Sequence, residues 1–422
     1  MLTSRRSRRM WVAGLVLAGM VLFPACGASD DSEASPDISG GLTKAPIKLM
    51  TIAAETGPFT YKEIAPAAKA AAKAINDSGG VNGHPIEIIS CDDKLTPDGA
   101  SACGRKAVSE NVTAVVGAQC TNGDNYMSVI SKAGIPSVAN QPVSSLEITS
   151  ELSFPIDAAV LQYVAAGSLL KATGARTVHF MGPNMPSFSG FVELVSGLLP
   201  SLGVDVDGTT LFPVEASDFT QYVASTYGSD ADGVIPFLIS GATVPGFVNA
   251  LDAGGYSLND KPTVVNGPLF RSSLLDDPKL KGRLDGLYMV SAGQTPTDES
   301  LPGIKTYHQE LADLGGEIDY STTGLQAWVG THVIADLLKK ASGDPTDPAT
   351  LIAAMESAGP ITYPGWTTFD WSKPALPAPL ADAFPRYFNT NTWVSKVEDN
   401  ELVSATTDEA SYTGPITLTT GQ

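Results

Sequence analysis

The alternation of short apolar runs with amphipathic stretches constrains the fold of this chain more than any other feature. From Ile47 onward, each apolar run of strand length is followed by a stretch with helical spacing, and Gly or Pro stands at each change of period. Such alternation is typical of parallel sheets with helices on both faces. The sequence therefore predicts an α/β fold made of doubly wound, Rossmann-like units.

The alternating pattern forms two similar units in tandem. The first has predicted strands at 47–53, 85–90, 112–116 and 135–138. The second has predicted strands at 177–182, 208–213, 233–239 and 263–266, and a further strand at 287–291 leads to helices at 302–314 and 324–341. Two α/β units in tandem leave a cleft between them, and such clefts bind ligands.

Residues 1–26 have the features of a secretory signal peptide. Four arginines precede an apolar run at 11–23, and small Ala25 stands before Cys26. The run is too short to span a bilayer comfortably. Residues 7–12 also resemble a twin-arginine signal, so both this route and the general secretory route remain open.

Ala25-Cys26-Gly27 is similar to the end of a lipobox, in which the cysteine is acylated and becomes the new amino terminus. Phe23 and Pro24 depart from the usual residues, and a simple cleaved signal is the alternative interpretation. Residues 27–44 are rich in Ser, Asp and Gly, which predicts a flexible tether.

The charge balance excludes nucleic acid as a partner. Four of the 26 Lys and Arg residues lie in the leader, which leaves 22 against 45 Asp and Glu and a formal net charge of −23. A strongly acidic surface repels phosphate backbones. No second apolar run has membrane length, so any transport channel must be another chain.

Several short motifs follow one another in a characteristic order. They are Thr56-Gly57-Pro58-Phe59, the turn at 74–83 that ends Gly79-Gly80-Val81-Asn82-Gly83, Asp92-Asp93, Val115-Val116-Gly117 and Gly134-Ile135-Pro136. In this order and spacing the chain resembles the leucine/isoleucine/valine-binding family of type I periplasmic binding proteins. The resemblance covers nearly the whole mature chain and is stronger before Thr149 than after it.

The resemblance implies a function and a domain layout. It implies the solute-binding component of an ABC importer, a monomer without cofactor, metal or catalytic activity, anchored outside the cell membrane and delivering solute to permease and ATPase subunits. It also implies an N-terminal lobe of 45–158 plus 290–362 and a C-terminal lobe of 159–289 plus 363–415. Three crossings near 154–161, 286–293 and 359–369 would join the lobes.

The loops at the carboxyl ends of the first predicted strands are candidates for ligand binding, because open parallel sheets bind ligands there. These loops are 57–61, 118–122 and 139–145. The resemblance implies that Cys120, Thr121, Gln141 and Ser144 grip a carboxylate. Thr121 and Ser144 could instead cap helices, as hydroxyl residues often do.

Aromatic residues are the candidates for the opposite wall of the site. Phe188 and Phe237 lie where the family has aromatic contacts, although both could be ordinary core residues, and Phe59 and Phe270 could add to the wall.

Leu269 stands where amino-acid binders of the family have an acid that meets the ligand ammonium. A buried ammonium without a counter-charge is costly, so we expect a carboxylate or amide solute rather than leucine. A shifted alignment could still bring in Glu215 or Asp276.

Three cysteines follow Cys26 in the mature chain. Cys91 ends a predicted strand and Cys103 lies on the next helix, so a Cys91–Cys103 disulfide is the preferred pairing. Cys120 could be a buried thiol or could itself be bridged, so the sequence leaves the connectivity open. The spacing of Cys and His fits no metal site.

Two other functions can be weighed against the residues they require. An extracellular hydrolase would need a catalytic constellation, but the four histidines are scattered and no nucleophile elbow, zinc-protease or phosphate-loop motif occurs. Asp92 and Asp93 are adjacent and point to opposite faces of an extended segment, which suits a turn better than acid–base catalysis. A ligand-sensing receptor on the same fold remains an alternative.

Overall fold

A computed structural model describes residues 42–57, 60–157, 159, 161–238, 243–317, 319–376, 378, 380–405 and 416–417. The chain divides after Asp37 into a leader segment and one compact unit, Ile38–Gln422, to which all described residues belong. The predicted signal peptide with Cys26, and Phe59, lie outside the described residues. None of the described helices combines the length and apolar character of a membrane span.

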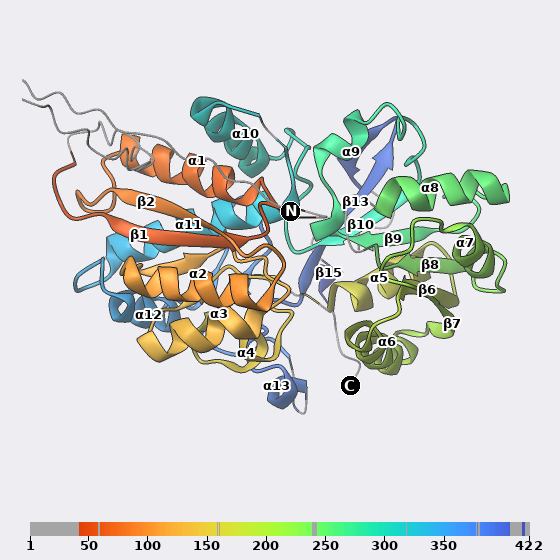
Figure 1. The fold of residues 1–422 in the computed structure, drawn as a ribbon, viewed down its shortest axis with the longest axis horizontal. Helices are drawn as coiled ribbons and strands as arrows, with labels where there is room; N and C mark the ends of the chain where they lie inside the picture. Colours follow the sequence, from red (N-terminus) through yellow and green to blue (C-terminus); the bar gives the residue numbers. More distant parts are fainter. Residues whose placement is uncertain are drawn as a thin grey trace, which may run out of the picture. The chain divides into compact units, whose positions relative to one another are not determined.

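The first sheet is parallel and has the strand order β2-β1-β3-β4-β5. Its strands are β1 (Ile47–Ala53), β2 (Ile86–Asp92), β3 (Ala114–Val116), β4 (Ser137–Val138) and β5 (Ser153–Phe154). Its helices are α1 (Ile64–Asp77), α2 (Pro97–Ser109), α3 (Gly123–Ile130), α4 (Ser145–Thr149), α10 (Pro302–Leu314), α11 (Thr322–Lys340) and α12 (Pro348–Ser357). Figure 1 shows α1 on one side of β1 and β2, with α2 and α3 on the other.

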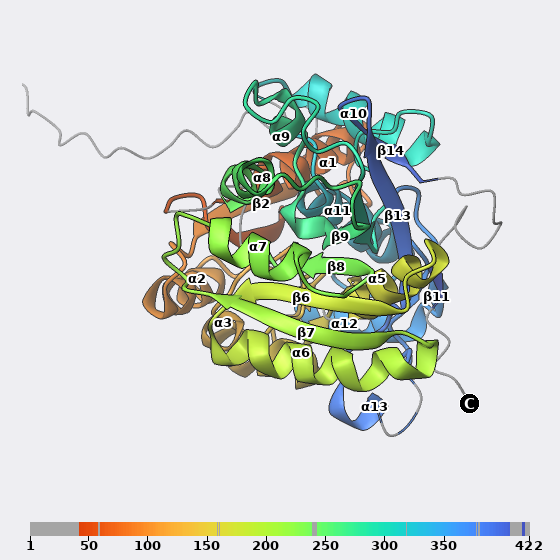
Figure 2. The same ribbon diagram turned by 90° about the vertical axis from the view of Figure 1, so that its right-hand side faces the viewer.

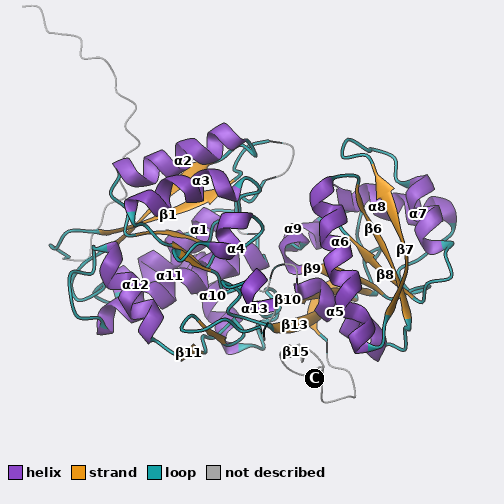
Figure 3. Cartoon of the chain, turned by 90° about the horizontal axis from the view of Figure 1, so that it is seen from below, coloured by secondary structure: helices purple, strands orange, loops and turns teal. Residues whose placement is uncertain are grey.

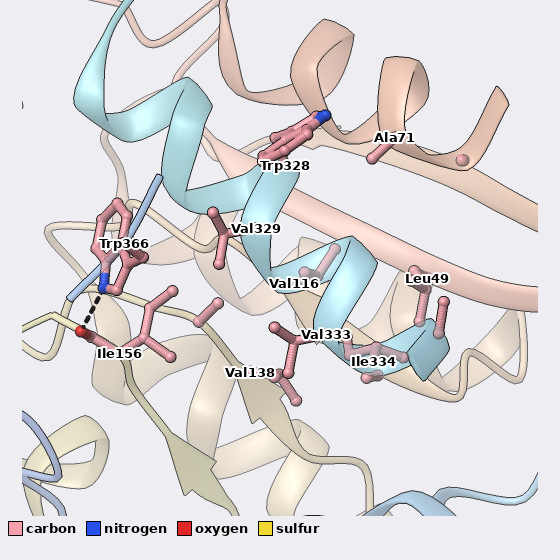
Figure 4. Close-up of a cluster of buried hydrophobic side chains, with 14 of the residues drawn as sticks. Leu49, Ala71, Val116, Val138, Ile156, Trp328, Val329, Val333, Ile334 and Trp366 are labelled. Atoms are coloured by element: carbon pink, nitrogen blue, oxygen red, sulfur yellow. Dashed lines mark hydrogen bonds between the residues drawn. The ribbon is translucent and has the colours of Figure 1, made fainter. Parts of the chain in front are cut away.

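Both faces of β1 are buried because successive side chains point to opposite sides of the sheet. Ile47 and Leu49 belong to the core that includes α1 and α11 (Figure 4), and Met50 and Ile52 belong to the core under α2 and α3. This double burial is the arrangement of a doubly wound parallel sheet. It confirms the predicted fold class for the first unit.

Local sequence signals set several boundaries of these elements. Thr96 is the N-cap of α2 and accepts a hydrogen bond from Gly99 N at 3.0 Å, with Pro97 as the first helical residue. After α1, Gly79 and Gly80 take positive φ angles of 98° and 67°. A Cβ on Gly80 would lie 2.3 Å from His84 O, so glycine is required at this turn.

The second sheet is mixed and has the order β14-β13-β10-β9-β8-β6-β7, with β15 paired to β13. Its strands are β6 (Thr177–Pro183), β7 (Asp205–Phe212), β8 (Gly233–Pro236), β9 (Thr263–Asn266), β10 (Leu287–Ser291), β13 (Asn391–Glu398), β14 (Glu401–Ser404) and β15 (Ile416–Thr417). The five strands from β6 to β10 are parallel, and β13 runs antiparallel to β10.

Helices cover both faces of the second sheet as well. They are α5 (Leu161–Ala172), α6 (Pro186–Leu198), α7 (Thr220–Tyr227), α8 (Thr243–Gly254) and α9 (Ser272–Asp276). Figure 2 shows α7 and α8 on one side of β6 and β7, with α6 on the other. Phe180 and Met181 of β6 accordingly belong to different cores. In Figure 3 the strands of both sheets lie between layers of helices.

The segment after residue 359 contributes to a core of the first lobe and to a core of the second lobe. Strands β13 and β14 join the second sheet, and Leu376 and Tyr387 lie in the second core. However, Trp366, Phe369, Trp371 and Phe388 lie in the first core. The change of core is therefore spread over 366–394 rather than confined to the expected crossing at 359–369, and the lobe boundaries given above stay a prediction.

Indole hydrogen bonds explain why this segment stays near the first core. Trp366 Nε1 donates to Ile156 O at 2.8 Å (Figure 4), and Trp371 Nε1 donates to Pro155 O at 2.9 Å. Both carbonyls belong to the first crossing, which follows β5, and both bonds are buried. A buried indole N–H needs such an acceptor. A short hairpin of β11 (Pro360–Ile361) and β12 (Phe369–Asp370) and a helix α13 (Leu380–Ala383) complete the segment.

The preferred disulfide, Cys91–Cys103, is present and joins the end of β2 to α2. Because the bridge closes a short loop with a sequence separation of 12 residues, replacing both cysteines by alanine should lower the free energy of unfolding by roughly 3 kcal/mol. Urea unfolding monitored by circular dichroism measures this. A reductant should destabilise the natural protein and leave the double variant unchanged; equal effects on both would contradict the prediction.

Candidate functional site

The first-lobe loops bring two amide side chains and a tyrosine together. Gln119 follows β3, Gln141 follows β4, and Gln119 Nε2 donates to Gln141 Oε1. Their backbone is fixed to the sheet, since Gln119 N donates to Ile52 O at 3.0 Å and Gln141 N to Ala118 O at 3.2 Å. The Tyr61 side chain, from the loop after β1, hydrogen-bonds to Gln119. The carboxyl ends of β1, β3 and β4 thus form one polar group, as predicted for the loops of a parallel sheet.

Cys120 and Thr121 lie next to this group but differ in exposure. The Cys120 thiol is buried and, among the described cysteines, is the one outside the disulfide. Burial raises the pKa of this thiol, and the adjacent Asp93 carboxylate raises it further. The Cys120 thiol is therefore protonated and only weakly polar. Thr121 is exposed, and its hydroxyl oxygen accepts from Asn122 Nδ2 at 3.4 Å.

Ser144 is the N-cap residue of α4, which matches the capping role considered as its alternative. It forms a capping box with Glu147, whose Oε2 accepts from Val143 N at 3.2 Å and from Ser144 N at 3.1 Å. Glu147 Oε1 accepts from Tyr126 Oη at 2.7 Å. The carboxylate is fully buried, and burial raises its pKa to about 7 despite these donors. Glu147 therefore fixes the loop that carries Gln141.

An aromatic cluster of the second lobe is the counterpart of the polar group in the first lobe. Tyr163 of α5 lies 4.4 Å from Phe191 and 5.6 Å from Phe237, measured between ring centroids, and Phe188 lies 5.3 Å from Phe237. Phe188 is buried with its ring against Gly182, so it is a core residue, whereas Phe237 is only partly buried. Ligand contact by Phe188 and Phe237 stays a prediction, and the geometry favours Phe237.

The tyrosines Tyr61 and Tyr163 connect the two sets of residues. Burial raises the pKa of Tyr163, and the nearby hydroxyl of Tyr61 and carboxylate of Asp157 raise it further. Tyr163 Oη is buried and has no hydrogen-bond partner among the described residues. Such an unpaired buried hydroxyl is costly unless a bound molecule or water completes it. Sequence reasoning did not single out either tyrosine, because neither stands in a motif.

Asp157 is the acid in the chain's first crossing, and it lies near Tyr163. Its Oδ1 accepts from Ala159 N at 2.5 Å and from Gln162 Nε2 at 2.6 Å. Burial raises its pKa to about 6, and these two donors limit the rise. The Oδ1 atom of this carboxylate is thus bonded at the start of the second lobe and orders the start of α5.

The loop after β9 brings no acid into the site. A 3₁₀ turn, Gly267–Leu269, follows the strand. Phe270 is buried in the core that contains Met181 of β6 and does not lie in an open wall. The side chain of Leu269 is not among the described ones. Glu215 and Asp276, the acids that a shifted alignment could introduce, are both exposed.

The cationic residue of that loop is already paired. Arg271 Nε donates to Glu63 Oε1 at 3.1 Å, and Arg271 Nη2 donates to Thr60 O at 2.6 Å. Among the described residues of this junction, the guanidinium is therefore occupied by first-lobe groups.

Three of the four histidines form separate structural pairs with acids. His179 Nδ1 lies 3.1 Å from Asp207 Oδ2, His308 Nδ1 lies 2.8 Å from Glu299 Oε1, and His332 Nε2 lies 2.9 Å from Glu310 Oε2. In the described part of the chain, no three His, Cys, Asp or Glu side chains are grouped to hold a metal ion. The arrangement around Gln141 and Tyr163 is suited to holding a molecule by hydrogen bonds and aromatic contact.

A surface cavity of about 590 Å³ lies elsewhere in the first lobe. Its lining comes from α11, α12 and the residues that follow them, including Leu337, Lys340, Ala354 and Tyr363. It shares no residue with the loops at the carboxyl ends of the strands, so it is a separate feature.

Comparison with known proteins adds independent information about the fold. A family model described as periplasmic binding protein matches residues 46–375. No curated protein matches the chain significantly.

Solved structures resemble the chain over most of its length. An extracellular ligand-binding receptor from Verminephrobacter eiseniae ef01-2 has a TM-score of 0.71 and 17% identity, over 85% of this chain and 99% of that one. A fatty acid ABC transporter substrate-binding protein from Thermomonospora curvata has 0.70 and 15%, over 86% and 92%. An ABC transporter solute-binding protein from R. palustris, in complex with 4-hydroxybenzoate, has 0.70 and 21%, over 86% and 96%. At these identities the likeness shows the fold alone.

The raised pKa of Glu147 makes a prediction about pH. The pKa is about 7 in the folded protein against an ordinary 4.5, so the stability that protonated Glu147 contributes is present below pH 4.5 and is lost as pH rises through 7. Between pH 5 and 8 the natural protein should lose about 2 to 3 kcal/mol of unfolding free energy that Glu147→Gln does not lose. Urea titrations across this range measure the difference.

The control for this experiment is Glu151→Gln, the same change at an exposed position near the end of α4. It should keep the pH dependence of the natural protein. Parallel pH profiles for the natural protein and Glu147→Gln would show that Glu147 is not the titrating group.

Proposed function

The chain belongs to the periplasmic binding protein family, and we propose that it is the solute-binding component of an ABC importer that captures a small solute between its lobes. The observation that carries this proposal is the proximity of Tyr61, which hydrogen-bonds to Gln119 of the first lobe, to Tyr163 of the second-lobe aromatic cluster. Gln119 and Gln141 lie with Tyr61 on one side, and Tyr163 and Phe237 lie on the other. Clamps of this kind gain ligand contacts from both lobes only when closed, so ligand binding shifts the population toward closure.

The proposed solute has a carboxylate or amide group and an apolar or aromatic body. Gln141 uses its oxygen for Gln119, so its amide N–H groups can donate to a carboxylate or carbonyl oxygen. Phe237 and Tyr163 offer ring faces to the body of the solute. The exposed position of Asp276 and the absence of an acid from the Gly267–Leu269 turn disfavour an ammonium group.

Two of the similar structures support this solute class. One is a fatty acid ABC transporter substrate-binding protein, and another is in complex with 4-hydroxybenzoate. A fatty acid and 4-hydroxybenzoate both combine a carboxylate with an uncharged body. Thr121 and Cys120, with Phe59 and Leu269, remain further proposed contacts from the family resemblance.

The proposed location is the outer face of the cell membrane. The family is extracytoplasmic, and the leader with its cysteine at position 26 fits a diacylglycerol anchor followed by a flexible tether at 27–44. The permease and ATPase subunits of the importer are the proposed partners.

A thermal-shift panel tests the solute class. Deaminated branched acids, aromatic acids and their amides should raise the melting temperature more than leucine or valine, because a solute at 100 times its Kd stabilises the folded state by about 2.7 kcal/mol. Gln141→Ala should weaken binding of the best solute roughly tenfold by removing a hydrogen bond to a charged group. Gln309→Ala, an exposed glutamine on α10, is the matched control. Stabilisation by leucine or valine alone would refute the proposed class.

Replacing the proposed lipidation site tests the anchor. Cys26→Ser should move the mature protein from the membrane fraction to the soluble extracytoplasmic fraction, because a diacylglycerol group can no longer be attached. Fractionation with an antibody measures the distribution. An unchanged membrane fraction for the variant, or a soluble natural protein, would favour the simple cleaved signal.

A further inference from the structure

The side chain of Arg271 extends from the second lobe to residues of the first lobe. It follows the 3₁₀ turn Gly267–Leu269, and its guanidinium meets Glu63 and Thr60, which precede α1. The Cζ atom also lies 5.1 Å from the centroid of the Tyr61 ring. One side chain therefore makes an ion pair, a backbone hydrogen bond and a cation–π contact across the two lobes.

Glu63, the acceptor of this ion pair, is also held by a residue of the first lobe. Glu63 Oε1 also accepts from Thr323 Oγ1 at 2.6 Å, and Thr323 lies in the first turn of α11. The Glu63 side chain is 4% exposed and that of Arg271 is 14% exposed. Moving the loop after β9 away from α1 and α11 would leave Glu63 without its counter-charge in a largely buried position, which is unfavourable.

Backbone contacts beside Arg271 fix where its side chain starts. Arg271 forms an isolated bridge with Ser321, and Ser272 N donates to Tyr320 O at 2.8 Å. Asp319 accepts from Ser273 N at 3.0 Å and from Ser273 Oγ at 2.8 Å. The loop after β9 is thus attached to the segment just before α11 by both backbone and side-chain bonds.

The ion pair adjoins the candidate binding residues without being one of them. Tyr61 lies against Arg271 on one side and hydrogen-bonds to Gln119 on the other. Gln119 in turn donates to Gln141. The state of the Arg271–Glu63 pair is therefore coupled through Tyr61 to the amide groups proposed to hold the solute.

We propose that Arg271 is a positioning residue that holds the two lobes in the closed arrangement through its ion pair with Glu63, and so raises affinity for the solute without touching it. The affinity part rests on the proposed function; the closure part does not. The ion pair keeps a fraction of the protein closed without solute, and bound solute increases that fraction.

Distances between spin labels in the ligand-free full chain test the closure. Labels attached to cysteines at Ala102 of α2 and Ala224 of α7, both exposed, report the separation of the lobes by pulsed electron paramagnetic resonance. Cys120 is buried and should stay unlabelled. In Arg271→Gln the ratio of short to long distances should fall at least about tenfold, the effect of losing a hydrogen-bonded charge pair.

Companion variants separate the ion pair from general damage. Glu63→Gln should lengthen the distances to a similar extent, and the double variant should add little to either single change, because the two residues act as one unit. Arg271→Lys should restore part of the short-distance population by keeping the charge. Arg283→Gln, which removes the Arg283–Asp252 pair within the second lobe, should leave the distribution unchanged.

The outcomes distinguish this inference from the proposed function. Unchanged distances in folded Arg271→Gln and Glu63→Gln would overturn the inference, whatever the solute panel shows. Longer distances in both, with partial recovery in Arg271→Lys, would support it even if no tested solute bound. Should Arg271→Gln fail to fold, Glu63→Gln and Arg271→Lys still decide the matter by the same distances.

Discussion

The burial of both faces of β1 is the constraint on which the position of the binding loops depends. Leu49 packs under α1 and α11, and Met50, the next residue, packs under α2 and α3. A strand covered on both sides can offer only its ends to another molecule. Because β1, β3 and β4 are parallel neighbours, their carboxyl ends lie together, and the side chains that follow them, among them Gln119 and Gln141, become one polar group.

The connection between the lobes depends on backbone carbonyls that accept side-chain donors. Ile156 O accepts from both Trp366 Nε1 and Asn389 Nδ2, and Pro155 O accepts from Trp371 Nε1. These bonds satisfy an irregular buried segment that has no strand partner of its own. They hold the crossing in a defined conformation, while the loop after β9 meets the segment before α11 through both backbone and side-chain bonds.

Three buried carboxylates of the described residues have clear structural partners. Glu147 is held by Tyr126 and two backbone amides, Asp157 by Ala159 and Gln162, and Glu63 by Arg271 and Thr323. Each carboxylate orders a loop or helix start beside the candidate site. The neutral amides, hydroxyls and aromatic rings proposed for recognition accord with a solute whose own charge is a single carboxylate or none.

The sequence by itself determined the repeated α/β units and many of their boundaries. Strands 47–53, 263–266 and 287–291 have the predicted bounds, and Thr96 caps the predicted helix, because hydrophobic period and capping are local properties. The short elements β5 and α4 escaped prediction, since two to five residues carry too little periodicity to be recognised.

Only the tertiary structure decided which side chains meet. Gln141 could be placed at the end of a strand from the pattern alone, but Tyr61, Tyr163 and Arg271 carry no local signal of their roles. The structure also assigned Phe188 to the core, where the sequence had left both possibilities open, and it buried Phe270, which the sequence had placed in the aromatic wall. The physical reason is that their partners lie far away in the chain: Arg271 meets Glu63 across 208 residues, and such pairings are set by the packing of whole lobes rather than by neighbours in sequence.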